Sequence, residues 1–152
     1  MLKKILVPIA FSKYSESILD YALKLAKPHG AKLLIVNVIS EKSLEAVEKI
    51  SSHGYKIDGD KYVATIQKER IELLEGMIER LTMDDDDYDY RLLAGDPAME
   101  LLRLILDEEV DLVVMGTKTR ELRHIFTGSV AERMFRRCPV PILSYRGGDV
   151  AK

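Results

Sequence analysis

Short segments rich in apolar residues alternate along this chain with longer segments patterned as helices. The runs Ile5–Ile9 and Lys32–Val38 are apolar almost throughout, as is typical of strands buried on both faces of a sheet. The other expected strands are Tyr88–Ala94, Asp111–Met115 and Pro139–Tyr145. This alternation predicts an α/β fold in which helices cover both faces of a parallel sheet. In such sheets a ligand binds beyond the carboxyl ends of the strands, where the winding direction reverses.

The segments between the strands have the periodicity of amphipathic helices. The first follows Ser12, a good N-cap residue, and ends at Pro28 and Gly30. Asp96 and Pro97 are an N-cap residue and a proline at the first helical position. Between the second and third strands we expect a short helix with Leu44, Val47 and Ile50, a loop over Ser51–Asp60 and a long helix over Ile66–Leu81. The residues expected to face inward are Ile18, Leu19, Ala22, Leu23 and Ala26; Ile66, Arg70, Leu73, Leu74, Met77, Ile78 and Leu81; Ala98, Leu101, Leu102, Ile105 and Leu106; and Val130, Ala131, Met134, Phe135 and Cys138.

Composition narrows the class of protein. The chain has 152 residues, which suits a single domain over residues 1–146 with a tail at 147–152. A formal net charge of -2 gives no reason to expect nucleic acid or a membrane as partner. The one cysteine, Cys138, cannot form an internal disulfide, so a cytoplasmic location is expected. No apolar run approaches the ~20 residues of a membrane span.

The stretch Leu112–Leu143 carries the clearest candidate site. An apolar run stops at Gly116, and Gly128-Ser129 opens a helix. A glycine after a buried strand and free N–H groups at a helix start are suited to holding phosphate. The alternative is structural, because Ser129 and Glu132 form a capping box and Gly116 serves as a turn glycine. From the residues alone the two interpretations balance. The basic side chains between the two glycines are Lys118, Arg120, Arg123 and His124.

The sequence lacks the common catalytic and metal-binding motifs. The sequence contains no GxxxxGK[ST], GxGxxG, GxSxG, CxxC or HExxH pattern. The acidic run Asp84–Asp87 does not fit a calcium loop, whose sixth and twelfth positions would be Asp89 and Gly95. A solvated acidic turn is the better interpretation. We therefore expect no metal and no conventional enzyme, with any ATP turnover slow and incidental.

The chain resembles the universal stress protein family along nearly all of its length. The matching segments, in order, are ILVPIAFSKYSESILDYALKLA, LLIVNVI, AGDPAMELLRLILDEEVDLVVMGTK and GSVAERMFRRCPVPIL. The resemblance implies a three-layer, Rossmann-like fold with a five-stranded parallel sheet in the order 3-2-1-4-5. It also implies a homodimer in which the last strand pairs antiparallel with its copy. The residues of that strand would be Val140, Ile142, Leu143, Ser144 and Tyr145.

The family's pattern for binding ATP or AMP is kept only in part. Gly116 and the pair Gly128-Ser129 match, but Ala10 stands where binders have aspartate and Thr119 where they have a second glycine. The Arg120–Thr127 loop is one residue shorter than the pattern. By the resemblance, the nucleotide contacts would be Pro8, Ile9, Ala10, Val38 and Met115 for adenine and Gly116, Gly128, Ser129 and Val130 for phosphate, with Lys118 and Arg120 as further phosphate contacts.

The sequence is compatible with three functions. The first is a small dimeric binding or signalling protein with ATP or AMP as ligand. The second is a dimeric interaction protein with a vestigial pocket, which Ala10 and Thr119 favour. The third is an adenylate-forming enzyme of a related fold, but this would need an SGGxDS-like turn after the first strand. The residues there, Ala10-Phe11-Ser12, do not match it.

Overall fold

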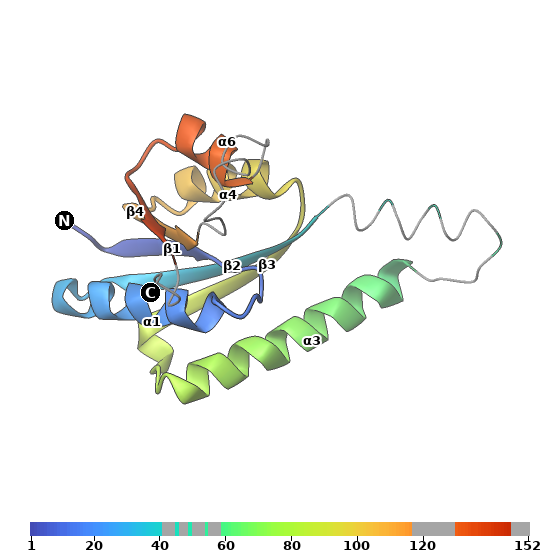
Figure 1. The fold of residues 1–152 in the computed structure, drawn as a ribbon, viewed down its shortest axis with the longest axis horizontal. Helices are drawn as coiled ribbons and strands as arrows, with labels where there is room; N and C mark the ends of the chain where they lie inside the picture. Colours follow the sequence, from blue (N-terminus) through green and yellow to red (C-terminus); the bar gives the residue numbers. More distant parts are fainter. Residues whose placement is uncertain (41–44, 46–48, 50–53, 55–58, 117–129, 147–152) are drawn as a thin grey trace, which may run out of the picture.

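The computed structural model describes residues 1–40, 45, 49, 54, 59–116 and 130–146, and it contains a five-stranded parallel sheet (Figure 1). The strands lie in the order β3-β2-β1-β4-β5, and every neighbouring pair is parallel. This confirms the predicted fold class and strand order. The strands are β1 (Lys4–Pro8), β2 (Lys32–Ser40), β3 (Tyr88–Gly95), β4 (Leu112–Gly116) and β5 (Ile142–Tyr145).

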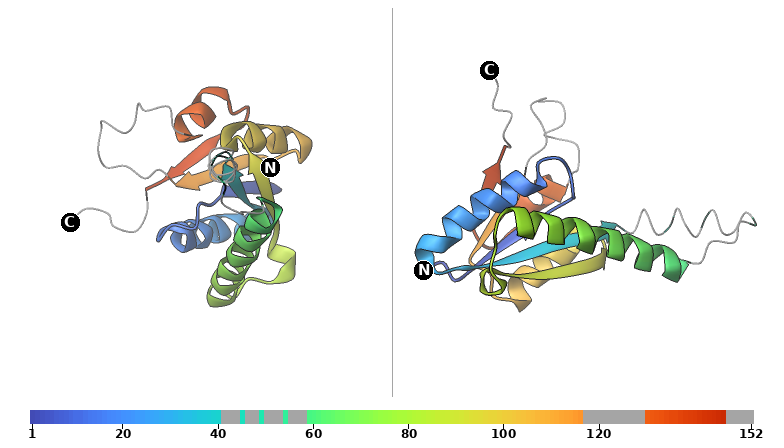
Figure 2. Two further views of the ribbon diagram at one scale, coloured as in Figure 1. Left: turned by 90° about the vertical axis from the view of Figure 1, so that its right-hand side faces the viewer. Right: turned by 90° about the horizontal axis from the view of Figure 1, so that it is seen from below.

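Helices cover both faces of the sheet, as Figure 2 shows most clearly. One face carries α1 (Ser15–Ala26) and α3 (Gly59–Arg80), and the other carries α4 (Pro97–Asp107) and α6 (Val130–Arg137). Two short 3₁₀ turns, η1 (Lys27–His29) and η2 (Asp85–Asp87), connect elements. None of the helices within the described ranges is long and apolar enough to cross a membrane.

The apolar strand runs are buried on both faces, because alternate side chains enter two separate cores. Ile5 and Val7 pack under α1 and α3, whereas Leu6 packs under α4 and α6. All three side chains are fully buried. β1 is a central strand of the sheet, because it pairs with β2 on one side and with β4 on the other.

Several local signals in the sequence act as expected. The Asp96 side chain accepts a hydrogen bond from the amide of Met99 at 3.0 Å and so caps α4, with Pro97 in its first turn. Gly30 ends the first helical segment in the left-handed conformation, with φ 62°. The acidic run forms a capping box, in which the amide of Asp84 donates to a carboxylate oxygen of Asp87 at 2.8 Å. The acidic run is therefore a turn.

The start of α1 corrects one prediction. Ser12 is not the N-cap, because α1 begins three residues later, at Ser15. The Ser12 hydroxyl instead accepts from the amide of Tyr14 at 3.2 Å, and its carbonyl accepts from that of Ser15 at 3.1 Å. Serine thus forms a turn that leads into the helix rather than the cap itself. Phe11, just before this turn, has a left-handed backbone (φ 54°), and the N-cap position of α1 is taken by Tyr14.

The first four strands differ from the predicted bounds by one or two residues, and two other elements differ more. Val140 is not part of the last strand, which begins at Ile142. Val140 lies in a bend between Pro139 and Pro141, and neither proline has an N–H to donate to a ladder. The long helix α3 begins at Gly59 rather than near Ile66, so the end of the expected loop is helical. The expected short helix with Leu44, Val47 and Ile50 lies outside the described residues.

Some residues expected to face inward are exposed. Leu73, Leu106 and Phe135 expose 53%, 68% and 51% of their surface. Each is the immediate neighbour of a residue that already occupies the inward position, and consecutive helical residues lie about 100° apart. The inward positions are held by Leu74, Ile105 and Met134, which are at most 2% exposed.

Candidate functional site

The candidate site lies at the carboxyl edge of the sheet, where β1 and β4 are neighbours. The chain winds in opposite directions from these two strands, so their carboxyl ends form the crevice in which such folds bind ligands. Pro8 ends β1, Met115 and Gly116 end β4, and Val38 lies near the end of β2. Ile9 and Ala10 follow β1 directly, and Val130 opens α6. The other predicted contacts, Lys118, Arg120, Gly128 and Ser129, lie outside the described residues, as do Thr119, Arg123 and His124.

The predicted adenine contacts do not share one face of the sheet. Val38 and Met115 pack with the core under α4 and α6, whereas Ile9 packs with the core under α1 and α3. Ile9 and Met115 are each 5% exposed, and Ala10 is exposed. The side chain of Ile9 is therefore buried in the core under α1 and α3, and only its backbone lies at the edge of the sheet.

Gly116 has a packing role that the sequence did not reveal. A Cβ at this position would lie 2.6 Å from Cδ1 of Ile18, which comes from α1. Carbon atoms do not approach so closely, so a side chain here would force Ile18 to move. The structural alternative considered for Gly116 thus gains support, but the reason is the close approach of a helix and not a turn.

A model of the universal stress protein family matches residues 1–146. The chain belongs to this family. The family's fold, seen in its solved members, is the three-layer arrangement described above.

Individual members of the family are distant in sequence but similar in fold. Universal stress protein MJ0577 of Methanocaldococcus jannaschii is 23% identical over 152 residues, covering 94% of each chain. Its solved structure matches with a TM-score of 0.74 at 24% identity, covering 98% of this chain and 99% of the other. A universal stress protein in complex with cAMP has a TM-score of 0.64 at 20% identity, covering 95% and 97%. One from Archaeoglobus fulgidus in complex with dAMP has a TM-score of 0.59 at 16% identity, again covering 95% and 97%.

In this universal stress protein the segment after β1 has a strained backbone. Phe11 adopts φ 54°, a conformation that costs a non-glycine residue about 1–2 kcal/mol. The Phe11 side chain packs against the core under α1 and α3, which holds it there. The sequence did not predict the left-handed backbone of Phe11, because glycine and asparagine are the residues that usually adopt this conformation.

A buried asparagine behind the candidate site was also missed. Asn37 lies within β2, is 5% exposed and donates from Nδ2 to the Ile9 carbonyl oxygen at 2.7 Å. Its Oδ1 accepts a hydrogen bond from Nη1 of Arg70 on α3. Two signals for this contact were present in the sequence: one polar residue in an apolar strand, and one arginine on the inward stripe of a helix.

A separate groove of about 270 Å³ lies between the segment after β1 and α3. Its charged side chains already interact within the molecule: Nε of Arg80 lies 2.6 Å from a carboxylate oxygen of Glu16, and Nζ of Lys13 lies 5.1 Å from the ring centre of Tyr14. This groove is therefore not a strong anion site. Its lining residues are Phe11, Ser12, Lys13, Glu16, Leu73, Met77 and Arg80.

The edge strand β5 pairs with β4 alone among the described strands. It pairs with β4, and the carbonyl of Pro141 accepts from the Val113 amide at 3.0 Å. The rings of Tyr145 and Tyr21 lie 5.1 Å apart, which ties the end of β5 to α1. The side chains of Ile142 and Leu143 are half-buried and that of Ser144 is exposed. The outer edge of β5 is thus the position from which a second strand could extend the sheet.

A carboxylate joins the amino ends of β1 and β4. Backbone amides of Lys3 and Lys4 donate to Oδ2 of Asp111 at 2.8 and 3.0 Å, which lowers the pKa of that carboxyl. A hydrogen bond from Lys4 lowers the pKa of Glu108, and Arg91 adds a further interaction. The contacts of Asp111 with Lys3 and Lys4 lie at the opposite end of the sheet from the candidate site and stabilise the pairing of β1 with β4.

Proposed function

We propose that this chain is a small binding module for an adenine nucleotide such as AMP or ATP, formed by a single domain over residues 1–146. The supporting observation is that residues predicted from separate strands, including Pro8, Val38 and Met115, lie at one carboxyl edge where the winding reverses. Two structural neighbours, solved with cAMP and dAMP, bind ligands of the same class.

Each group has a stated role in the proposal. The half-buried Val38 supplies apolar contact for the base, the buried Met115 packs beneath it, and the backbone of Gly116 lies beside the phosphates. Amides at Gly128, Ser129 and Val130 donate to phosphate oxygens, and Lys118 and Arg120 add positive charge. Ala10 supplies no carboxylate, so we expect weaker binding than in members that have one.

Calorimetry with AMP and ATP tests this proposal. We expect a heat of binding with the intact chain that disappears in Gly128→Asp, because a carboxylate there repels phosphate. Ala64→Asp is the matched control, because it adds the same charge at an exposed position on α3. Binding retained in both variants, or lost in both, contradicts the assignment of phosphate to Gly128.

A second candidate function is a protein–protein interaction module with a vestigial pocket. The observation in its favour is that Gly116 is explained by its contact with Ile18, without any ligand. No heat with nucleotide at millimolar concentration supports this alternative. We propose binding rather than catalysis in either case, and pyrophosphate release from ATP would revive the enzyme hypothesis.

We also propose that the module is a homodimer formed through β5. β5 is the last strand in the order of the sheet, and an antiparallel copy would extend the sheet from there by strand pairing. Ser144→Lys places like charges near each other across the two-fold axis and should shift the protein from dimer to monomer in analytical ultracentrifugation. Ser144→Thr is the control and should remain dimeric. A monomeric wild-type chain at micromolar concentration contradicts the proposal.

A further inference from the structure

The Asn37 side chain uses both ends of its amide in a buried position. Nδ2 donates to the Ile9 carbonyl at 2.7 Å, and Oδ1 accepts from Arg70. A guanidinium can only donate and a carbonyl can only accept, so only this orientation of the amide satisfies both partners. With 5% of its surface exposed, Asn37 is fixed between a helix and a strand end.

This contact interrupts the ladder between β1 and β2. The amide of Ile9 still donates to the Val36 carbonyl at 2.8 Å, as in a regular parallel pair. In a continued ladder the Ile9 carbonyl would next accept from the amide of Val38. The Asn37 side chain takes that place, and among the described residues we find no hydrogen bond from the Val38 amide to β1. Accordingly, β1 ends at Pro8 while β2 continues to Ser40.

The same contact sets the direction of the next peptide group. Alternate residues of a parallel strand turn their backbone groups toward the same neighbour. Ile9 turns both its N–H and its C=O toward β2, so the N–H of Ala10 turns toward β4. All described peptide bonds are trans, which keeps the Ile9 C=O and the Ala10 N–H on opposite sides. The Ala10 amide therefore points toward the crevice between β1 and β4.

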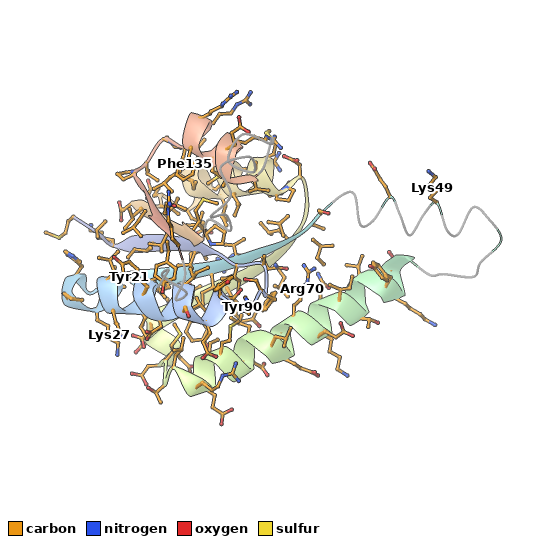
Figure 3. All side chains as sticks on the ribbon, viewed as in Figure 1. Tyr21, Lys27, Lys49, Arg70, Tyr90 and Phe135 are labelled. Atoms are coloured by element: carbon orange, nitrogen blue, oxygen red, sulfur yellow. The ribbon has the colours of Figure 1, made fainter. Side chains whose placement is uncertain are left out.

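Arg70 of α3 orients the Asn37 side chain from the face of the sheet that α3 covers. It extends from α3 toward the sheet (Figure 3), and its hydrogen bond to Asn37 is the one side-chain hydrogen bond that it makes among the described residues. No carboxylate lies within ion-pair distance of its guanidinium in that part of the chain. A half-buried guanidinium that orients a neutral amide is suited to fixing a side-chain rotamer.

We infer that Asn37 and Arg70 are positioning residues that hold the β1–β2 ladder open and direct the Ala10 and Val38 amides to the nucleotide site. The inference rests on the proposed function. It assigns those amides to acceptor atoms of the ligand, such as purine ring nitrogens or phosphate oxygens. Asn37 and Val38 are consecutive in β2, so the positioning contact lies behind the strand and the candidate pocket in front of it.

Amide hydrogen exchange on the ligand-free full chain tests the geometry. In the wild type, the Val38 amide should exchange at least about tenfold faster than the Val36 amide, which lies inside the ladder. Asn37→Leu removes the competing donor, so the Val38 amide should pair with the Ile9 carbonyl and exchange about tenfold more slowly. Asn37→Leu must show wild-type circular dichroism for this comparison.

Calorimetry on the same proteins tests the connection to the ligand. Arg70→Met keeps most of the apolar stem but removes the guanidinium, and it should weaken AMP binding by about tenfold and alter exchange at Ala10. Arg103→Met is the matched control, because Arg103 is 62% exposed and pairs with Glu100 on α4. It should change neither quantity.

The outcomes separate the two proposals. A Val38 amide as protected as that of Val36, or an Arg70→Met variant that behaves like Arg103→Met, overturns the inference even if AMP binds. The expected exchange pattern without any nucleotide binding refutes the proposed function and the ligand-directed part of the inference. Slower exchange at Val38 in Asn37→Leu, together with weaker AMP binding in Arg70→Met, supports both.

Discussion

Replacing Gly116 with alanine tests whether its missing side chain is required by packing. The new Cβ would lie 2.6 Å from Cδ1 of Ile18, and Ile18 is 6% exposed, so its methyl has little room to move. Overpacking of this kind costs about 1–3 kcal/mol. Alanine recovers about 0.5–1 kcal/mol, because it loses less conformational entropy than glycine and this glycine does not have a positive φ. We expect a net destabilisation of about 0.5–2 kcal/mol.

A second substitution makes the argument specific. Ile18→Val removes the Cδ1 atom that collides and by itself should cost about 0.5–1.5 kcal/mol. If the collision is the cause, the double variant should be more stable than the sum of the single effects predicts, by about 1 kcal/mol. Urea unfolding measures all four proteins, and in thermal unfolding each kcal/mol corresponds to about 2–4 °C.

Additive effects in this cycle would refute the packing explanation. So would a Gly116→Ala variant as stable as the wild type. Gly116 would then have to be explained by the approach of a ligand to its backbone, and the double variant would bind AMP no better than Gly116→Ala alone.

Two further predictions concern stability. Asp96 caps α4 and also pairs with Arg133 at 2.9 Å, so Asp96→Ala removes both contacts and should lower the free energy of unfolding in urea by about 1–2 kcal/mol. Asp96→Asn still caps and loses only the partly exposed ion pair, so it should lose about 1 kcal/mol less than Asp96→Ala. The pKa of Asp111 is lowered by the amides of Lys3 and Lys4, so its stabilisation is present above the ordinary aspartate pKa of about 3.9 and is lost as pH falls through the lower folded value. Urea unfolding between about pH 5 and 2 should therefore show the wild type losing more stability than Asp111→Asn, and equal losses would contradict the assignment.

Local patterns were enough to predict the architecture. Apolar runs marked strands that are buried on both faces, and their alternation with helices predicted the parallel sheet. The resemblance to universal stress proteins supplied the strand order. Signals that act within a few residues also held, such as the cap at Asp96 and the left-handed Gly30. Each of these features depends on residues that are neighbours in the chain.

The candidate site was predictable only as a set of positions. The resemblance selected Pro8, Val38 and Met115, and parallel strands necessarily bring their carboxyl ends to one edge. The sequence did not indicate which face each side chain would occupy, nor that Ile9 would be committed to the core. The surroundings of each face of the sheet depend on which helices pack against it, and this packing brings together residues that are far apart in the chain.

Contacts across the fold decided the rest. At Gly116 the methyl group of Ile18 from α1 occupies the space that a Cβ would need, and β1 ends where an asparagine on β2, held by an arginine on α3, contacts the Ile9 carbonyl. Within helices, the choice of Met134 over Phe135 for the inward position depended on the surface offered by the sheet. The periodicity of the sequence indicates which helix residues could face inward. The surface against which the helix packs decides which of them are buried, because burial and hydrogen bonding depend on both partners of a contact.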